Sequence, residues 1–412
     1  MTYRFSGART IVFIFWILAF AAIPLWIRTD LPAWDLHIYL NALHAMQAGH
    51  DPYADGIAVQ QAFHAQQALH PNAVPPYTYV YSPITLPLLR LVGAIPGWLS
   101  GSVFWLLYIA GVLSLIWVGM LAVMPKERRY FLYFAPAAAF FPGLLVQEAL
   151  LSGNVAYILY GLILVAAVAG WRRGEWRWFY LATLAASCCK APLLSLLPIP
   201  VLSARRQWLP AALTGAVGVG LFAMQPWLWP TLFHHYLQAV ELQFSYNQDF
   251  GFSPAGLFDQ VLVHAGIAYM PASSIFYLLY ALPLFGLLLY LSRRYFEGRF
   301  LLEQWMPVLL LGVILLNPRI MIYDAAPLTI PMALIVWRFF ASFMTTVKTI
   351  ACACGFFVLV NAIVLAVPDG VLWKDLDGVL LVVVFAAGCW NLLRQPAPKH
   401  GESAGPGMAM MR

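Results

Sequence analysis

The chain has 412 residues, of which 62% are hydrophobic and only 10% are charged, and its mean hydropathy is +0.77. A soluble domain carries about 25% charged residues, so this composition excludes an ordinary soluble protein and predicts a membrane bundle. The formal net charge of +6 is typical of the basic loops that anchor a membrane protein, and it does not indicate nucleic-acid binding.

A membrane-spanning helix takes about 20 apolar residues, and ~17 is the lower limit. Ten apolar segments approach this length, and they are 10–27, 103–123, 131–147, 154–170, 209–225, 274–291, 301–316, 325–341, 350–367 and 379–393. A further apolar stretch, 178–203, is interrupted at Lys190 and Pro192, which predicts two short helices that form a membrane hairpin. We therefore expect an all-α, polytopic transmembrane bundle of about twelve spans. One domain covers 1–394, and the Pro-, Gly- and Met-rich residues 395–412 are expected to be a disordered cytoplasmic tail.

The basic residues orient this bundle. With the N-terminus inside, 18 of the 23 Lys and Arg residues fall in inner loops, four fall outside and Lys190 lies in the hairpin. The positive-inside rule therefore predicts a cytoplasmic N-terminus. Twelve of the 17 acidic residues then lie outside or at the outer edge, so the groups capable of acid–base chemistry gather on that face.

Two long outer segments carry most of the polar and aromatic residues. The first outer segment, 28–101, has an amphipathic stretch after Asp35 that predicts a helix on the membrane surface. Gly49 is expected to end that helix. The apolar piece 84–95 is too short to cross, and we interpret it as an interfacial or re-entrant helix. The second outer segment is 226–272.

Charged residues at membrane depth are costly, and they mark function by default. The candidates are Asp35, Lys190, Arg319 and Asp324. Each has a structural alternative. Asp35 could cap the surface helix, Lys190 could extend toward the interface, and Arg319 and Asp324 could pair with each other. The shared placement of these residues near one face favours a functional site there.

The five cysteines all fall inside predicted spans, where they act as small apolar residues rather than as a disulfide framework. Neither a zinc-ligand spacing nor a glycine-rich phosphate loop occurs in the sequence. We therefore expect no metal and no cofactor.

Four short motifs then follow one another along the chain. They are 35–39 with 49–53, next 79–83, then 152–154 with Lys190 and Pro192, and finally 317–318 with Tyr323 and Asp324. With these motifs the chain resembles glycosyltransferase family 87, which contains membrane-embedded mannosyltransferases of the GT-C superfamily. The resemblance implies a GT-C-like fold in a plasma membrane such as the bacterial inner membrane, with an extracytoplasmic active site. It also implies a polyprenyl-phosphate sugar donor, most often of mannose, and a lipid or glycan acceptor.

The family places a catalytic aspartate just after the first span, and Asp35 matches that position. Such a carboxylate can take the proton of an acceptor hydroxyl while the lipid phosphate leaves, with inversion at the sugar. Lys190 and Arg319 are expected to hold the donor phosphate, because a guanidinium can bind phosphate through two hydrogen bonds. Sugar and acceptor contacts are expected from Tyr39, Tyr79, Tyr81, Asn154, Asn247, Tyr323 and Asp324.

Two departures leave the sugar open. Members that use mannose often have a histidine pair where this chain has Tyr323 and Asp324, and 152–154 replaces a glycine–glutamine form. Mannose, another hexose and a pentose are therefore alternatives. A flippase or transporter of lipid-linked sugars is the main alternative function, although the internal repeats typical of transporters are absent from the sequence. An acyltransferase is disfavoured because eight of the nine histidines lie in outer segments.

Overall fold

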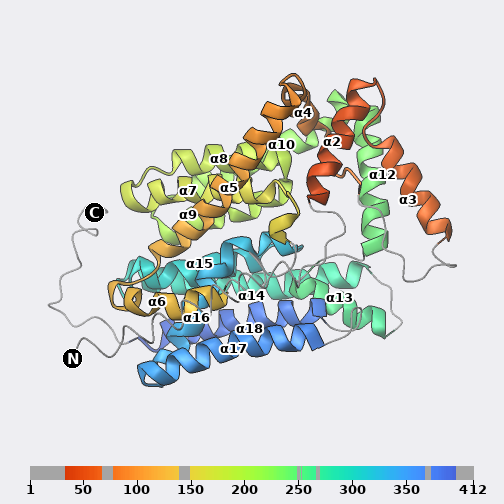
Figure 1. The fold of residues 1–412 in the computed structure, drawn as a ribbon. Coiled ribbons are helices and arrows are strands. Elements are labelled where there is room, and N and C mark those ends of the chain that lie inside the picture. The colour runs from red at the N-terminus through yellow and green to blue at the C-terminus, as the bar shows by residue number, and fades with distance from the viewer. Residues whose placement is uncertain are drawn as a thin grey trace.

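The computed structural model describes residues 33–66, 78–138, 149–247, 251, 253–265, 270–366 and 373–395. Every regular element in these ranges is a helix, apart from one isolated β-bridge (Figure 1). The predicted all-α class is therefore confirmed. The expected first span, 10–27, and residues 396–412 of the expected tail lie outside the described residues.

The first outer segment folds into short helices. They are α2 (Trp34–Gln47), α3 (Ala54–Gln66), the 3-10 helix η1 (Pro83–Thr85) and α4 (Leu86–Gly93). α2 ends just before Gly49, whose φ of +77° suits a residue without a side chain. The structure confirms that both predicted segments are helical, and their placement at a membrane surface stays a prediction. No sequence pattern predicts α3, because its apolar residues do not repeat with a helical period.

The bundle that follows consists of longer apolar helices and short 3-10 turns. In chain order these are α5 (Gly97–Leu121), α6 (Pro125–Ala138), η2 (Ala149–Leu151), α7 (Ala156–Arg173), α8 (Arg177–Cys189), η3 (Ala191–Leu196), α9 (Pro198–Ser203), α10 (Trp208–Ala223), α11 (Gln225–Leu228), α14 (Met270–Phe296), α15 (Leu302–Leu315), η4 (Ile322–Asp324), η5 (Ala326–Leu328), α16 (Thr329–Ala341), α17 (Thr346–Ala366) and α18 (Trp373–Leu393). Every predicted span with described residues overlaps one of these helices.

In the part of the chain that the structure describes, five helices are long and apolar enough to cross a membrane, and five further apolar helices are shorter. Large apolar side chains cover the outside of the bundle, for example Leu106 on α5, Leu213 on α10 and Leu282 on α14. Soluble proteins rarely expose apolar surface on this scale. Helices of this kind are consistent with a membrane protein, and the number of twelve crossings stays a prediction.

The centre of the bundle is formed by α15 and α16, in which Trp305–Leu315 and Thr329–Trp337 are buried without interruption. α5 and α7 lie against each other through small residues, since a side chain at Gly161 would come within 2.8 Å of the Gly111 Cα atom. Small residues allow membrane helices to approach closely. This contact fixes the beginning of α7, which carries part of the candidate site.

The predicted hairpin is present between α8 and α9. α8 ends at Cys189, and Lys190 departs from helical geometry with φ −139° and ψ 88°. The chain then turns back through η3 and α9. Trp171 at the end of α7 donates a hydrogen bond of 3.0 Å to the hydroxyl of Ser203, the last residue of α9. Because α8 follows α7 directly, the end of α9 therefore lies near the beginning of α8. The break at Lys190 is therefore confirmed.

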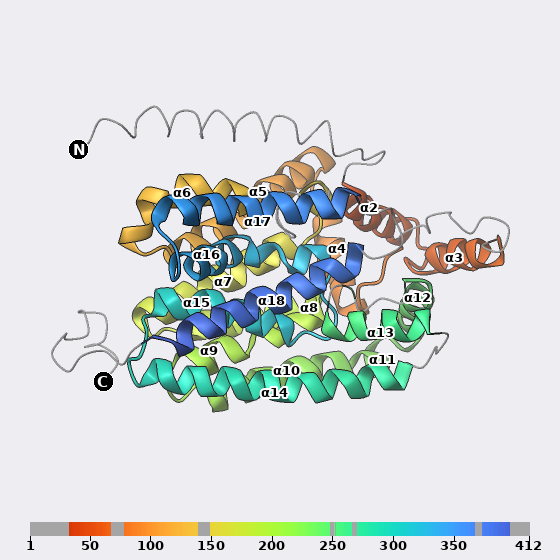
Figure 2. The same cartoon turned by 90° about the horizontal axis from the view of Figure 1, so that it is seen from below.

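Figures 1 and 2 show the short helices gathered at one end of the bundle. We call this the α2 end; it holds α2, α3, α4 and α12 (Pro230–Asn247), with α13 (Pro254–His264) nearby. α12 is joined to α3 by a buried hydrogen bond of 2.7 Å from Gln60 to Gln243. The opposite end holds α6 and the neighbouring ends of α15 and α16, and we call it the α6 end.

A buried ion pair ties the helices together at the α6 end. Arg338 of α16 donates two hydrogen bonds of 2.8 Å to the carboxylate of Glu127 on α6. Its remaining donors reach the carbonyl oxygens of Glu303 and Ala122, at 2.8 and 2.7 Å. Such two-point contacts between a guanidinium and a carboxylate are among the strongest hydrogen bonds in proteins.

Replacing Arg338 with glutamine should therefore lower the free energy of unfolding by about 3–5 kcal/mol, because it leaves the buried Glu127 carboxylate uncompensated. The exposed pair of Arg293 and Glu297 provides the control, and Arg293→Gln should change stability by about 0–1 kcal/mol. Titration of both variants with denaturing detergent in mixed micelles measures the difference. Equal losses in the two variants would contradict a structural role for the buried pair.

Candidate functional site

The site begins where α2 meets the chain just before α7. The main-chain N–H groups of Ala33 and Asp35 donate hydrogen bonds to the carbonyl oxygens of Leu151 and Ser152, at 2.7 and 2.9 Å. Ala33 precedes the helix in a left-handed conformation, with φ 59°, which an L-residue adopts only when its surroundings hold it there. The first turn of α2 is therefore fixed against residues 151–152.

Asp35 is the second residue of α2, and no side chain caps this helix. The alternative of a capping role for Asp35 is therefore wrong. A cap would need the aspartate one position before the helix, with its oxygen turned back to the main-chain N–H groups. Asp35 lies inside the first turn instead, and its side chain interacts with Ser152 and Asn154.

The Asp35 carboxylate is buried, with 8% of the residue exposed. Its Oδ2 atom has no hydrogen-bond partner among the described residues. Burial raises the pKa of Asp35 from 3.8 to about 6, although hydrogen bonds from Asn154 and Ser152 and the positive charge of Lys190 lower it. A buried carboxylate with one unused oxygen is rare in proteins. Together with a pKa near neutrality it marks a candidate acid–base group.

Residues 152–154 form a tight loop that places Asn154 beside Asp35. The Asn154 N–H donates to the Ser152 hydroxyl at 3.0 Å, and the Asn154 side-chain oxygen accepts from the Ala156 N–H at 2.9 Å. Gly153 has a φ of +68°, and a side chain there would come within 3.1 Å of the Leu36 Cβ atom. Because the oxygen of Asn154 supports α7, its amide N–H₂ group is left to face the carboxylate.

Tyrosine side chains form the next part of the site. The hydroxyl groups of Tyr39 and Tyr81 are 2.7 Å apart, and Tyr39 also accepts a hydrogen bond of 3.3 Å from the Val155 N–H. Tyr53 supports the pair by donating to the Tyr81 carbonyl oxygen at 2.6 Å. Burial raises the pKa of Tyr39 and Tyr81 well above 10, and the nearby Asp35 carboxylate raises both further. Both phenols therefore stay protonated.

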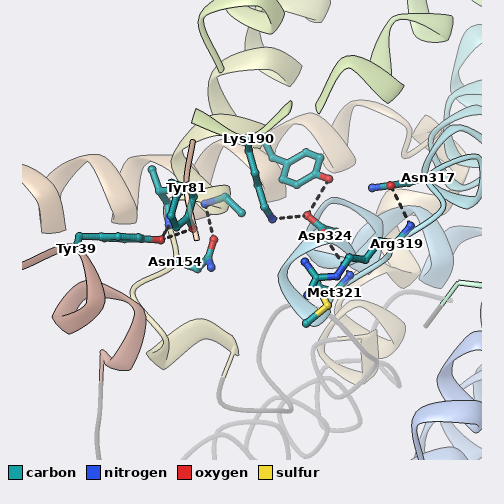
Figure 3. Close-up of polar contacts among 11 residues, drawn as sticks. Tyr39, Tyr81, Asn154, Lys190, Asn317, Arg319, Met321 and Asp324 are labelled. Atoms are coloured by element: carbon teal, nitrogen blue, oxygen red, sulfur yellow. Dashed lines mark hydrogen bonds and ion pairs between the residues drawn. The ribbon is translucent and has the colours of Figure 1, made fainter. Parts of the chain in front are cut away.

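Lys190 and Asp324 form the charged part of the site. The Lys190 ammonium lies 2.9 Å from Asp324 Oδ1, and it also lies 4.3 Å from the centre of the Tyr323 ring. Asp324 Oδ1 accepts a second hydrogen bond from the Tyr160 hydroxyl at 3.1 Å, and Oδ2 accepts from the Met321 N–H at 3.0 Å. Lys190 therefore points toward Asp324 instead of extending toward the interface (Figure 3). Asp324 forms its ion pair with Lys190, not with Arg319 as the sequence alternative had it.

Arg319 belongs to the same irregular segment as Asp324. Its N–H donates to the Asn317 side-chain oxygen at 3.2 Å. The next residue, Ile320, forms a parallel bridge with Gly251 of the second outer segment. Only glycine fits at 251, because a side chain there would lie 2.0 Å from the Ile320 carbonyl oxygen. In the view of Figure 3, Asp324 lies between Lys190 and Arg319.

The structure brings most of the predicted site residues to one place. Asp35, Lys190 and Tyr323 act on one another electrostatically. Tyr79 takes a more peripheral position, since its hydroxyl is paired with that of Thr85 at 2.6 Å. Asn247 is the last residue of α12, and its side chain lies outside the description.

Sequence reasoning missed three contributors to the site, which are Ser152, Tyr53 and Tyr160. Ser152 lies in a recognised motif, but nothing in the sequence shows that it faces Asp35. Tyr160 carries a polar hydroxyl group in an apolar helix, and this feature of the sequence could have identified it as a candidate.

Within the described ranges, no three His, Cys, Asp or Glu side chains lie close enough to share a metal ion.

Comparison of the chain with protein-family models, with curated proteins and with solved structures finds no significant match. The resemblance to glycosyltransferase family 87 therefore rests on its short motifs alone.

The ion pair of Lys190 and Asp324 predicts a specific pattern of stability. Asp324→Asn leaves the Lys190 ammonium without its counter-charge and should lower the free energy of unfolding by about 3 kcal/mol. Lys190→Met in the same chain removes the stranded charge, so the double variant should be more stable than Asp324→Asn alone. A double-mutant cycle by detergent-induced unfolding measures the coupling. Additive effects of the two substitutions would show that the pair is not formed.

Proposed function

We propose that this protein is a membrane glycosyltransferase that moves a sugar from a polyprenyl-phosphate donor to a hydroxyl group of a lipid or glycan acceptor at the α2 end. The observation that carries the proposal is the buried Asp35 carboxylate, whose Oδ2 atom has no partner among the described residues and whose pKa is about 6. A cation and several phenols lie around it, in a bundle whose exterior is apolar. Mannose is the first sugar to test, because the motifs resemble those of mannosyltransferases.

In the proposed reaction the acceptor oxygen attacks the anomeric carbon of the donor sugar. The new glycosidic bond forms as the bond between that carbon and the phosphate oxygen breaks. Asp35 takes the proton of the acceptor hydroxyl, and the polyprenyl phosphate leaves with the electron pair. A base works best when its pKa lies near the working pH, and a pKa of about 6 leaves Asp35 largely ionised at pH 7.

Asp35 acts alone in this scheme because Asp324, the other carboxylate that the described residues bring to the site, is occupied. Asp324 accepts three hydrogen bonds, from Lys190, Tyr160 and the Met321 N–H. It therefore has little capacity to attack a sugar or to take a proton. Glycosyl transfer with one available carboxylate proceeds by a single displacement, whereas retention in glycosidases uses a second carboxyl group as nucleophile. The proposal therefore includes inversion at the anomeric carbon.

The leaving phosphate requires positive charge. An ammonium group has three N–H donors, and one contact of Lys190 is made with Asp324, so Lys190 keeps donors for phosphate oxygens. Asp324 sets the direction of the lysine side chain. Arg319, on the segment that Gly251 holds in place, is proposed to bind the same phosphate through its planar guanidinium group.

The sugar would lie between this charged pair and the tyrosines. Tyr39, Tyr81 and Tyr323 present protonated hydroxyl groups or aromatic faces toward the region of Asp35. A tyrosine offers an apolar ring and a polar tip, which suits a sugar with its alternating C–H and O–H groups. Asn154 would orient the Asp35 carboxylate through its amide.

The direct test is sugar transfer by purified, lipid-reconstituted protein that is supplied with radiolabelled polyprenyl-phosphate mannose and a membrane lipid extract. Asp35→Asn keeps the shape of the side chain and removes the base, so the rate should fall by about 10²–10⁴-fold. Asp55→Asn is the matched control, because Asp55 is an exposed aspartate on α3, and its transfer rate should equal that of the wild type.

Two results would contradict the proposal in different ways. Transfer at the wild-type rate by Asp35→Asn would remove Asp35 from the mechanism but leave the reaction class. Absence of transfer from every polyprenyl-phosphate sugar, combined with movement of the lipid between leaflets, would replace the enzyme by the alternative flippase.

The raised pKa of Asp35 predicts the pH dependence of transfer. A base is active when it is ionised, so the rate should fall tenfold per pH unit below about 6 rather than below about 4. Lys190→Met should move this acid limb to higher pH, because the lysine charge favours ionised Asp35. The measurement is kcat/KM against pH for both proteins. An acid limb near pH 4, or one that Lys190→Met leaves in place, would contradict the assignment.

A further inference from the structure

A second site lies at the α6 end. The structure has a cavity of about 610 Å³ there, between the ends of α6, α15, α16, α17 and α18. Its lining includes Lys126, Arg129, Trp337, Arg338, Asn391 and Arg394. Figure 2 shows these helix ends far along the bundle from α2, so the cavity is separate from the candidate active site. Its volume falls within the range of about 300–1,000 Å³ that is usual for ligand sites.

The lining of the cavity is strongly basic. It carries four cationic side chains and one carboxylate, that of Glu127. Arg338 is committed to Glu127, so these two charges neutralise each other in the wall. Lys126, Arg129 and Arg394 have no carboxylate partner among the described residues. The structure gives these arginines aromatic neighbours instead, since Arg129 lies over Tyr130 and Arg394 over Trp390. Three positive charges therefore remain for an anionic ligand.

An unpartnered donor in the cavity wall points to the same kind of ligand. The side-chain Nδ2 atom of Asn391 is buried and has no hydrogen-bond partner among the described residues, and Asn391 lines the cavity. Buried donors are nearly always satisfied in folded proteins. An anionic oxygen atom in the cavity would accept a hydrogen bond from Asn391 while it interacts with the basic side chains.

The rim of the cavity is apolar. Phe343 and Met344, in the turn between α16 and α17, line the cavity and are exposed, and Val347 beside them is 72% exposed. A basic pocket with an apolar rim suits an anionic amphiphile rather than a purely water-soluble anion. Basic pockets between transmembrane helices bind anionic lipid head groups on the cytoplasmic side, which is the side that the positive-inside pattern predicts for this end.

We propose that the cavity at the α6 end binds the phosphate head group of an anionic phospholipid. Lys126 and Arg394 contact the phosphate, Asn391 donates a hydrogen bond to it, and the acyl chains leave across Phe343, Met344 and Val347. This site does not depend on the glycosyltransferase proposal, because none of its residues belongs to the candidate active site.

The test is a binding titration of the purified full-length protein in a neutral detergent, with bound lipid counted by native mass spectrometry. Phosphatidylglycerol is the anionic probe, and phosphatidylcholine is the neutral one. The double variant Lys126→Gln/Arg394→Gln should weaken phosphatidylglycerol binding by about tenfold or more, since it removes two charge-assisted contacts. The matched control is Arg173→Gln/Arg205→Gln, which removes two exposed arginines that do not line the cavity, and it should bind phosphatidylglycerol like the wild type.

Asn391→Leu separates ligand binding from folding. Removing a buried, unpartnered donor should keep or raise the melting temperature of the lipid-free protein. The same substitution should reduce the stabilisation that phosphatidylglycerol produces, because the hydrogen bond to the phosphate is lost. A general folding defect would lower the melting temperature with and without lipid, so this variant remains informative even if the double variant proves unstable.

Three results would overturn the proposal. The first is equal binding of phosphatidylglycerol and phosphatidylcholine, and the second is unchanged phosphatidylglycerol binding by folded Lys126→Gln/Arg394→Gln protein. The third is binding of glycerol 3-phosphate or inorganic phosphate as tightly as phosphatidylglycerol, which would assign the cavity to a soluble phosphate compound. Selective phosphatidylglycerol binding that is lost in the double variant and kept in the arginine control would support it.

Discussion

The ion pair between Lys190 and Asp324 joins two places where the helices of this bundle are interrupted. One is the break between α8 and η3, and the other is the irregular segment between α15 and α16. Where a helix ends inside a folded bundle, its last main-chain groups need partners elsewhere in the protein. Asp324 provides one for the Met321 N–H, and Lys190 provides others through its N–H to Ala186 and its carbonyl oxygen to Leu193. A third interruption, at residues 152–154 before α7, contacts the Asp35 side chain of α2.

The pairing also explains how Asp35 keeps a pKa near neutrality. A lysine that faced Asp35 alone would form an ion pair with it and lower its pKa strongly. Here Asp324 takes the direct contact at 2.9 Å, and Lys190 acts on Asp35 less strongly than burial or the Asn154 hydrogen bond. Burial therefore has the largest effect on Asp35 and raises its pKa above the ordinary value. Asp324 is committed to positioning a cation, while Asp35 has an oxygen that contacts no donor in the described part of the chain and a pKa of about 6.

The apolar segments of the sequence predicted the long helices of the bundle, Lys190 and Pro192 predicted the hairpin break, and Gly49 predicted the end of α2, because each of these features depends on local composition. Contacts between distant segments were not predictable in this way. The pairing of Lys190 with Asp324 joins residues 134 positions apart, and the sequence offered Arg319 as an equally good partner. The capping role for Asp35 was wrong because α2 begins one residue earlier, at Trp34. The first turn of α2 is held there by main-chain hydrogen bonds to Leu151 and Ser152, which are distant in the sequence. The cavity at the α6 end arises from five helix ends, and no motif marks it.

In the proposed reaction a single carboxylate, Asp35, serves as the base in a direct displacement. The stereochemistry of the transferred sugar tests it most directly, since the anomeric configuration of the product can be read by NMR and compared with that of the donor. We expect complete inversion, because Asp324 is held by Lys190, Tyr160 and the Met321 N–H and has little capacity to act as a nucleophile. Retention of configuration would require a covalent sugar intermediate on a second nucleophile, and it would rule out a direct displacement with Asp35 as the base.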